Sequence, residues 1–226
     1  MPETSTTQQG FIFDLDGVVV DTFKYHYQAW RRVADSLGIE FTEAQHHGLQ
    51  GIGRMASLEK ILDHGNIYLP DAEKLHWADV KNNWYVELVA HMTPAEVLPG
   101  VREFLEEIKD QNYRTALVSS SRNAGAVLQS THLDHLFDAV VDGNVIKKPK
   151  PDPERYLLAA QSLQLAPAQC TVFEDTLAGV FGAAHSGFFV VGIGKPEQLL
   201  YAHCVIPGFT NLTLAELQSK TERVCS

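Results

Sequence analysis

The sequence predicts an α/β protein in which a doubly wound, mostly parallel sheet carries an all-helical insertion. Short strand-like runs alternate with helix-period segments through most of the chain, which is typical of strands joined by crossover helices. The stretch between residues 23 and 92 differs, because it holds several helix-period segments and no convincing strand. We therefore expect a core domain of residues 1–22 and 93–226, and a helical domain of residues 23–92 inserted directly after the first strand.

The first predicted strand, Phe11–Phe13, leads into two carboxylates, Asp14 and Asp16, followed at once by Gly17. Residues two apart on a strand point to the same side, and open α/β sheets bind ligands at the carboxyl ends of their strands. Two converging carboxylates repel each other unless a cation lies between them, and Mg²⁺ is the oxygen-preferring ion that fits. A carboxylate can also act as a nucleophile that forms an acyl phosphate. An acidic turn without a function is the alternative.

The remaining core elements alternate along the chain after the insertion. Helix-period apolar residues begin at Val101, again at Tyr156 just after Pro153, and once more at Leu177. The strand-like runs among them are Thr115–Ser119, Ala139–Val141, Thr171–Phe173 and Phe189–Gly192. Inside the insertion the helix-period segments are Tyr25–Leu37, Ser57–Leu62 and Glu73–Val89. The first of these precedes Gly38, which stands where a helix C-cap residue is expected.

A polar turn follows the second strand, with the residues Ser119, Ser120, Ser121, Arg122 and Asn123. A hydroxyl that ends a strand beside the backbone amides of a starting helix makes an anion site. Arg122 can add charge-assisted hydrogen bonds to a phosphate. Ordinary helix capping by the serines is the alternative.

A basic segment, Lys147–Pro153, contains three lysines and three prolines. The prolines favour a rigid turn that keeps a lysine out of a helix. Its ammonium group can stabilise the charge of a nucleophile and of transferring phosphoryl oxygens. A solvated basic loop is the alternative.

A later strand ends in adjacent carboxylates, Glu174 and Asp175. Such a pair suits a metal site in which one carboxylate ligates directly and the other through water. It also suits a plain helix N-cap formed by Asp175.

In this order the four motifs resemble those of the haloacid dehalogenase superfamily of phosphotransferases, over nearly the whole chain beyond residue 10. The resemblance implies a Rossmann-like core with a helical cap domain. It implies that Asp14 is the nucleophile that carries the phosphoryl group and that Asp16 is the general acid/base. Mg²⁺ would bind through Asp14, the Asp16 backbone carbonyl and Asp175, with Glu174 close by. Ser119 and a lysine would hold the transferring phosphate.

Two residues compete for the role of that lysine. Counting back from Tyr156, which resembles the aromatic residue of the family's Lys-Pro-x-Pro-Asp-x-Phe pattern, selects Lys150. The same pattern read without its aromatic residue also fits Lys148. We prefer Lys150 as the catalytic lysine and leave Lys148 as the alternative.

The predicted cap holds the candidate specificity residues. Thr22 can cap the helix that follows it, and the helical spacing then puts His26 and Trp30 on one inward face. Gly51 and Arg54 fall in a predicted flexible loop, from which the arginine could grip a second phosphate bidentately. A packed histidine and a surface arginine are the alternatives.

These cap residues are similar to those of the β-phosphoglucomutase family. The similarity extends to Lys81–Asn82 in the cap, and to Asn123, which matches that family's distal-phosphate asparagine. Arg122 stands where the family often carries lysine. The predicted substrate-binding residues are Thr22, His26, Trp30, Gly51, Arg54, Ser57, Lys81, Ser121, Arg122 and Asn123.

The resemblance implies a phosphomutase that interconverts β-glucose 1-phosphate and glucose 6-phosphate through an aspartyl phosphate. β-Glucose 1,6-bisphosphate would be both the intermediate and the priming phosphodonor. A Mg²⁺-dependent sugar-phosphate phosphatase built from the same motifs is the alternative. His26, Arg54 and Lys81 favour the mutase, because hydrolysis needs no second phosphate grip. A sugar-phosphate-binding protein without activity is disfavoured, because every chemically required group is present.

Composition narrows the class of partner. The 226 residues carry a formal net charge of −10, which argues against non-specific binding to nucleic acids or anionic membranes. No apolar run approaches the ~20 residues that span a bilayer. Three cysteines, Cys170, Cys204 and Cys225, lack metal-type spacing, and their odd number suits a reducing compartment. We expect a cytoplasmic monomer that acts on small sugar phosphates.

Overall fold

The computed structural model describes residues 10–49 and 51–224, so the predictions that concern residues 1–9 and Cys225 lie outside the described residues. Its six-stranded sheet has the order β3-β2-β1-β4-β5-β6, and every pairing is parallel. The strands are β1 (Gly10–Asp14), β2 (Arg114–Val118), β3 (Ala139–Val141), β4 (Cys170–Glu174), β5 (Phe189–Ile193) and β6 (Cys204–Ile206). Because β2 and β4 flank β1, the strand order reverses at β1, which is where such sheets bind their ligands.

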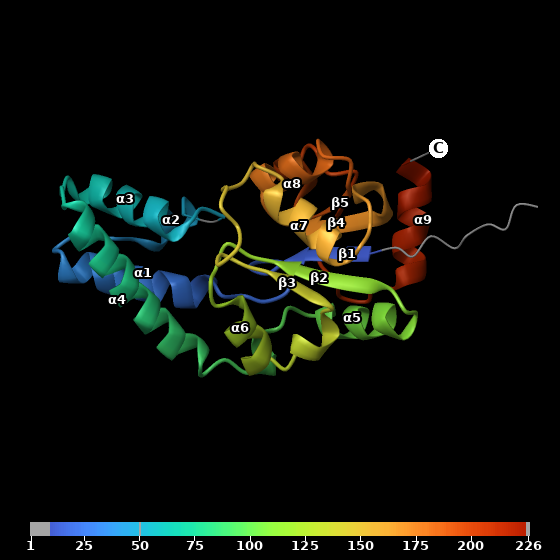
Figure 1. Ribbon diagram of the computed structural model, residues 1–226, viewed down its shortest axis with the longest axis horizontal. Coiled ribbons are helices and arrows are strands. Elements are labelled where there is room, and N and C mark those ends of the chain that lie inside the picture. The colour runs from blue at the N-terminus through green and yellow to red at the C-terminus, as the bar shows by residue number, and fades with distance from the viewer. Residues whose placement is uncertain (1–9, 50, 225–226) are drawn as a thin grey trace, which may run out of the picture.

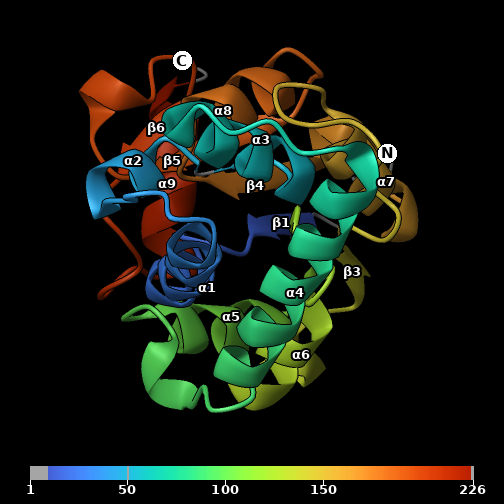
Figure 2. The ribbon, with the colours of Figure 1, turned by 90° about the vertical axis from the view of Figure 1, so that its left-hand side faces the viewer.

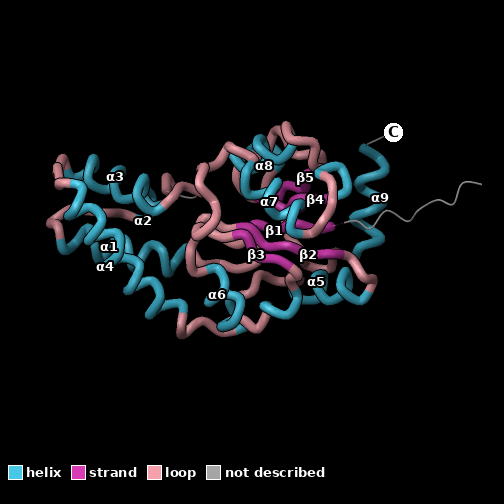
Figure 3. The backbone as a smooth tube through the Cα atoms, in the orientation of Figure 1, coloured by secondary structure: helices cyan, strands magenta, loops and turns pink. Residues whose placement is uncertain are grey.

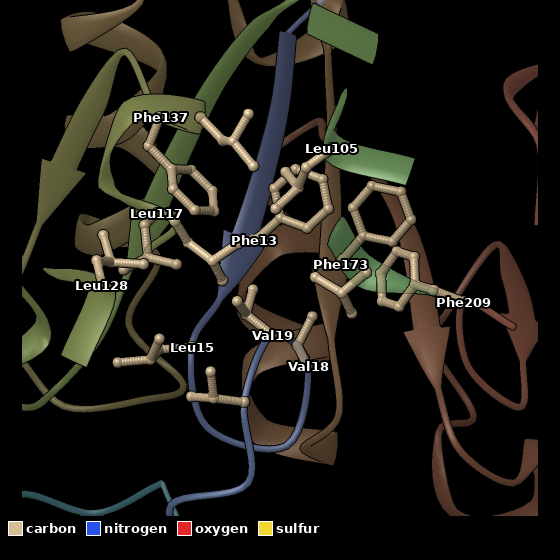
Figure 4. Close-up of a cluster of buried hydrophobic side chains, with 14 of the residues drawn as sticks. Phe13, Leu15, Val18, Val19, Leu105, Leu117, Leu128, Phe137, Phe173 and Phe209 are labelled. Carbon is tan, nitrogen blue, oxygen red and sulfur yellow. The ribbon is translucent and has the colours of Figure 1, made fainter. Parts of the chain in front are cut away.

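Strand β1 is buried along its whole length, as expected for a parallel strand covered on both faces. Its residues alternate between two cores: Phe11 and Phe13 belong to one cluster of buried side chains and Ile12 to the other. Phe13 stacks on Phe173 of β4, with ring centroids 4.6 Å apart, at the centre of the first cluster (Figure 4). This packing fixes where β1 ends and hence where Asp14 begins.

Five helices cover the two faces of the sheet (Figure 1). On one face lie α5 (Val101–Asp110), α6 (Ala124–Ser130) and α9 (Leu214–Val224), and on the other α7 (Glu154–Ser162) and α8 (Leu177–Ala184). Figure 3 shows the strands enclosed between these helices. Short 3₁₀ helices span Pro94–Glu96, Asp134–Leu136, Pro167–Gln169 and Pro196–Gln198. The doubly wound arrangement predicted from the alternation of elements is confirmed.

The helical insertion lies between β1 and β2 and comprises α1 (Phe23–Ser36), α2 (Glu43–His47), α3 (Arg54–Gly65) and α4 (Asp71–Val89). Figure 2 views the molecule from this side, with these helices in front of the sheet. They enclose their own apolar cluster, which includes Trp30, Val33 and Leu58. Toward its end α4 joins the core instead, through Tyr85 and Val89. The insertion thus has an apolar cluster of its own, and the division into two domains stays a prediction.

Among the helices and strands that the structure describes, α2, β6 and α9 escaped the sequence analysis. Helix α2 has only five residues, although Thr42 and Gln45 form a capping box at its start. Strand β6 has three residues, of which only Ile206 is buried, so no apolar alternation marks it. In the described part of the chain, no helix is long and apolar enough to cross a membrane.

The two connections between the insertion and the core run side by side. Val20 and Val97 form an antiparallel bridge. The backbone N–H of Leu98 donates to the Val19 carbonyl at 3.0 Å, and the N–H of Asp21 donates to the Glu96 carbonyl at 3.2 Å. The two crossing segments therefore form a short hydrogen-bonded ribbon.

One acidic side chain ties this ribbon to the first helix of the insertion. The Glu96 carboxylate accepts hydrogen bonds from the Tyr25 hydroxyl at 2.9 Å and from the Thr93 backbone N–H at 2.7 Å. Lys24 lies 3.5 Å from the same carboxylate. These bonds hold the pKa of Glu96 at about 2, with the Thr93 N–H as the largest cause.

Candidate active site

A cavity of about 610 Å³ lies between the insertion and the carboxyl ends of the strands. Its lining includes residues that directly follow four neighbouring strands, and these are Asp16, Ser120, Gly143 and Asp175. All ten predicted substrate-binding residues line it, together with Asp14 and Lys150. Ser119 and Glu174 are fully buried and hold other site residues in place, so the sequence motifs converge on one region.

Lys150 lies beside the predicted nucleophile. Its Nζ is 3.0 Å from Asp14 Oδ1 and 2.8 Å from Glu174 Oε1, and its side chain is 4% exposed. Burial opposes the positive charge, but the two carboxylates together raise the pKa of Lys150 above its usual value. Lys148 is 64% exposed and pairs with Asp152 at 3.3 Å. Of the two candidate lysines, Lys150 is the one in contact with Asp14.

Glu174 is held by a closed set of donors. The Tyr156 hydroxyl donates to its Oε2 at 2.7 Å, and Thr176 donates to its Oε1 from both the backbone N–H and the hydroxyl, at 3.0 and 2.5 Å. A Cβ at Gly179 would lie 2.3 Å from the Glu174 carboxyl carbon, so α8 can approach only with glycine there. Thr176 also caps α8, and the alternative of an N-cap at Asp175 is therefore wrong.

Three carboxylates gather where the sequence predicts a metal. Asp14, Glu174 and Asp175 each offer an oxygen, and these oxygens lie within 4.8 Å of one another. Asp175 Oδ1 is buried without a hydrogen-bond partner among the described residues. Burial, and then the charge of Glu174, raise the pKa of Asp14 to about 7 and that of Asp175 well above its ordinary value. Crowded carboxylates with an unpaired oxygen fit a hard divalent cation such as Mg²⁺.

Asp16 reaches the cavity by a different route from the one expected. Strand β1 ends at Asp14, so Asp16 lies in the following turn and the same-side rule for strands does not place it. The Thr22 hydroxyl donates to Asp16 Oδ1 and makes no capping bond to α1, so the predicted capping role of Thr22 is wrong. Burial raises the pKa of Asp16 even though the Thr22 hydrogen bond opposes it. Asp16 is thus suited to hold a proton.

On the insertion side, aromatic side chains and a buried lysine line the cavity. Lys81 Nζ lies 2.8 Å from His26 Nδ1 and sits 4.9 Å from the ring centre of Trp30 and 4.6 Å from that of Tyr85. Burial, followed by the charge of Arg54, lowers the pKa of Lys81 to about 7. Burial and the charge of Lys81 lower the pKa of His26 well below its ordinary value, so the neutral imidazole accepts the lysine's hydrogen bond. His26 faces inward, as its position in the helix predicted.

Hydrogen bonds connect the insertion to the core at the edge of the cavity. Arg54 Nη2 and Asn123 Nδ2 both donate to Asn82 Oδ1, at 2.7 and 2.8 Å. Arg54 is the first residue of α3, which corrects its predicted place in a flexible loop. Burial, and then the charge of exposed Arg122, lower the pKa of Arg54. Asp79 approaches Arg54 at 3.8 Å, so several cationic and amide donors meet here with one weak carboxylate partner.

Other predicted site residues use their polar groups for hydrogen bonds within the protein, or shape the backbone beside the cavity. The Ser57 hydroxyl donates to the Gly53 carbonyl at 3.1 Å. Ser119 Oγ accepts the backbone N–H of Ser121, also at 3.1 Å, which folds the polar turn back on itself. Gly51 has a φ of +74°, a conformation that favours glycine.

Two cavity residues were missed by the sequence analysis. Arg155 is 1% exposed, and its Nη1 donates to Ser120 Oγ at 2.9 Å. His46 is 4% exposed, and burial followed by the charge of Lys81 lowers its pKa to about 4. Arg155 lies in an amphipathic helix in which an arginine is ordinarily exposed, and His46 lies in the unpredicted α2. No local signal distinguishes either residue.

Comparisons with known proteins identify the family of this chain. A family model described as haloacid dehalogenase-like hydrolase matches residues 8–187. The chain is 38% identical over 214 residues to a β-phosphoglucomutase of Bacillus subtilis, covering 94% of this chain and 95% of the relative. A phosphorylated carbohydrates phosphatase of Thermotoga maritima is 34% identical, covering 79% and 82%.

A solved structure extends the likeness to three dimensions. The crystal structure of a β-phosphoglucomutase from Clostridium difficile superimposes with a TM-score of 0.91 at 37% identity, covering 96% of this chain and 98% of that one. Identity at this level over whole chains includes both the sheet and the helical insertion. The chain therefore belongs to the haloacid dehalogenase-like hydrolase family, as a phosphotransferase related to the β-phosphoglucomutases.

Proposed function

We propose that this protein is a β-phosphoglucomutase that interconverts β-glucose 1-phosphate and glucose 6-phosphate through an aspartyl phosphate and β-glucose 1,6-bisphosphate. The observation that carries the proposal is the presence of two groups of phosphate-binding side chains in one cavity. Lys150 contacts Asp14 on the core side, whereas Arg54 and Asn123 converge on Asn82 where cap and core meet. A bisphosphate needs both groups, and a monophosphate undergoing hydrolysis needs one.

The core side performs the chemistry. Asp14 carries the phosphoryl group and passes it to the C6 hydroxyl of β-glucose 1-phosphate, while Asp16 takes the hydroxyl proton. The bisphosphate then presents its C1 phosphate to Asp14, the bond between phosphorus and O1 breaks, and Asp16 returns the proton to O1. The raised pKa of Asp16 suits it to exchange this proton, and Thr22 orients its carboxyl group. Lys150 and Ser119 hold the transferring phosphate.

Asp14, Asp175, Glu174 and the Asp16 backbone carbonyl would hold Mg²⁺, and the unpaired Asp175 oxygen supports this assignment. When bound, the ion neutralises the carboxylates and the transferring phosphoryl oxygens.

The cap, residues 23–92, supplies specificity and excludes water from the aspartyl phosphate. Arg54, Arg122 and Asn123 hold the phosphate that is not being transferred. His26 and Lys81 contact the sugar, and Trp30 and Tyr85 cover it. These residues favour transfer to a sugar hydroxyl over transfer to water.

The decisive experiment follows glucose 6-phosphate and free phosphate together. Purified protein is mixed with Mg²⁺ and β-glucose 1-phosphate and primed with a trace of β-glucose 1,6-bisphosphate. We expect glucose 6-phosphate with little free phosphate. In Arg54→Ala mutase flux should fall about 10–100-fold, the loss of one or two charged hydrogen bonds, with hydrolysis of acetyl phosphate within about twofold of the wild type. Arg31→Ala, on an exposed cap surface, is the matched control.

A sugar-phosphate phosphatase is the second candidate, favoured by the Thermotoga maritima relative whose name specifies that activity. Free phosphate without glucose 6-phosphate would assign this function and overturn the mutase. Equal losses of mutase flux and acetyl phosphate hydrolysis in Arg54→Ala would overturn the second phosphate site.

A further inference from the structure

Arg155 is a buried cation without a carboxylate partner. It lies in the first turn of α7, is 1% exposed, and is among the largest fully buried side chains. It forms no ion pair with any residue that the structure describes, and its Nε is buried without a hydrogen-bond partner. Burying an unpaired charge is costly, and buried arginines are almost always paired. The guanidinium therefore lacks a counter-ion that the working enzyme must supply.

The side chain reaches the cavity at the phosphate-binding turn. Arg155 lines the cavity alongside Lys150 and Ser120, and its Nη1 donates to Ser120 Oγ at 2.9 Å. Gly143 packs closely against the same turn, since a Cβ at Gly143 would lie 2.3 Å from the Ser120 carbonyl oxygen. The backbone N–H of Gly143 donates to the Ser121 carbonyl at 3.1 Å. The turn is thus clamped between Arg155 and Gly143.

The position of the charge indicates which anion is missing. The Asp14 carboxylate already pairs with Lys150. The Glu174 carboxylate accepts hydrogen bonds from Lys150, Tyr156 and Thr176. Arg155 lines the same cavity as Asp14, and its partner Ser120 directly follows Ser119, the residue predicted to hold the transferring phosphate. An anion beside both Asp14 and Ser120 occupies the place where a phosphoryl group enters and leaves.

We propose that Arg155 is a positioning residue for the transferring phosphate: it fixes the Ser119–Ser121 turn through Ser120 and supplies a second positive charge beside Lys150. This inference rests on the proposed function in one respect, that Asp14 carries the phosphoryl group. It holds for transfer to a sugar or to water alike. Even with Mg²⁺ bound, one lysine leaves a dianionic phosphate and the carboxylates Asp14, Asp16, Glu174 and Asp175 with an excess of negative charge, so a second cation favours phosphate binding.

The test measures phosphate binding separately from turnover. Isothermal titration calorimetry with inorganic phosphate and Mg²⁺ compares the wild type with Arg155→Met, Arg155→Lys and Ser120→Ala. We expect Arg155→Met to raise the Kd at least about tenfold, which is about 1.4 kcal/mol. Ser120→Ala should raise it about threefold, as expected for one neutral hydrogen bond, and Arg155→Lys should lie between these two. Arg114→Met is the control, because that arginine bonds the Leu163 carbonyl at 3.1 Å and does not line the cavity.

A second readout separates positioning from a merely structural role. Hydrolysis of acetyl phosphate is measured at saturating Mg²⁺, and kcat and KM are compared between variants. Because Arg155 is proposed to act on the bound phosphate, Arg155→Met should raise the KM about tenfold, and Arg155→Lys should restore part of this loss by restoring the positive charge.

A wild-type Kd and a wild-type KM for acetyl phosphate in folded Arg155→Met would overturn the proposal. If that variant does not fold, wild-type Kd values in both Arg155→Lys and Ser120→Ala overturn it instead. Phosphate binding that depends on Arg155, in an enzyme that releases free phosphate and no glucose 6-phosphate, would contradict the mutase and leave this inference standing.

Discussion

Lys150 and Lys81 are almost equally buried, one in the core and one in the cap, yet their surroundings differ in every respect. Lys150, 4% exposed, contacts two carboxylates, and its pKa is raised. Lys81, 3% exposed, lies among aromatic rings and a neutral histidine, and its pKa is lowered to about 7. Burial penalises both charges, so the presence or absence of a paired carboxylate decides whether the pKa rises or falls.

The two lysines are suited to different functions. The core side of the cavity keeps its lysine charged over the whole physiological pH range, as the proposed phosphate site requires. The cap side holds a lysine that can lose its proton near neutrality and can therefore respond to a substrate beneath it. The four predictions below break or sharpen this contrast, from the largest expected effect to the smallest.

Asp14→Asn should reduce turnover by at least about 10⁴-fold, because it removes the proposed nucleophile. The same substitution should increase the stability of the metal-free protein. The folded-state pKa of Asp14, about 7, exceeds the ordinary 3.8, so the stability of the wild type falls as pH rises through that window. In EDTA the variant should be the more stable protein at pH 8, and the difference should shrink toward pH 4. Turnover assays and urea unfolding at several pH values check both statements, and substantial residual turnover would remove Asp14 as the nucleophile.

Lys150→Met should destabilise the metal-free protein by about 3–5 kcal/mol, because Asp14 and Glu174 then face each other without their cation. Urea unfolding at pH 7 in EDTA measures the loss. Lys148→Met is the matched control and should change the free energy of unfolding by less than about 0.5 kcal/mol, since that side chain is exposed. Similar losses in both variants would contradict the contrast in burial and pairing.

Lys81→Met should become more stable relative to the wild type as the pH falls from 10 to 7. The pKa of Lys81 is lowered from 10.5 to about 7 in the folded state, so its contribution to stability is present above about pH 10.5 and is lost as pH falls toward 7. Relative to the wild type, the variant should therefore gain about 3.5 kcal/mol between pH 10 and pH 7. Urea unfolding at the two pH values measures this gain. A difference that is constant with pH would mean that Lys81 titrates normally.

Tyr25→Phe tests the connection between the two regions and should have the smallest effect. It removes the hydroxyl that donates to Glu96 at 2.9 Å and leaves the aromatic ring in place. We expect a loss of about 1 kcal/mol in the free energy of unfolding, with phosphorylation of Asp14 by acetyl phosphate unchanged. Tyr68→Phe, at an 86% exposed tyrosine, is the control. A loss of phosphorylation in Tyr25→Phe would show that the connection also acts on the core side.

The sequence predicted the core more completely than the cap side of the site. Long buried strands such as β1 and amphipathic helices such as α5 carry their own apolar patterns, so they were found with ends within a few residues. The two glycines that precede Arg54, Gly51 and Gly53, predict a loop, whereas Gly53 is the N-cap residue of α3. A hydroxyl before a helix usually caps it, which predicts a capping role for Thr22. Its real partner, Asp16, becomes available only when the chain turns back after β1.

Arg155 and the two lysines show where prediction from local pattern ends. The difference between Lys150 and Lys148 is one of burial, created by contacts with Glu174 and with Asp14, 136 positions away. The burial of Arg155 likewise depends on the turn that follows β2. Motif spacing named the two lysines but not Arg155, and the surroundings of all three depend on tertiary neighbours.

The paired linkers at Val20 and Val97 determine how the cap can move. A domain attached by one chain segment can swivel about it, whereas two segments hydrogen-bonded edge to edge resist torsion and yield most easily by bending. For a cap that opens and closes, as the proposed exclusion of water requires, we expect this ribbon to leave nearly a single degree of freedom. A cap that swings along one path returns to the same register over the core after each turnover, and accuracy of alignment becomes a property of the backbone ribbon that no cavity residue has to provide.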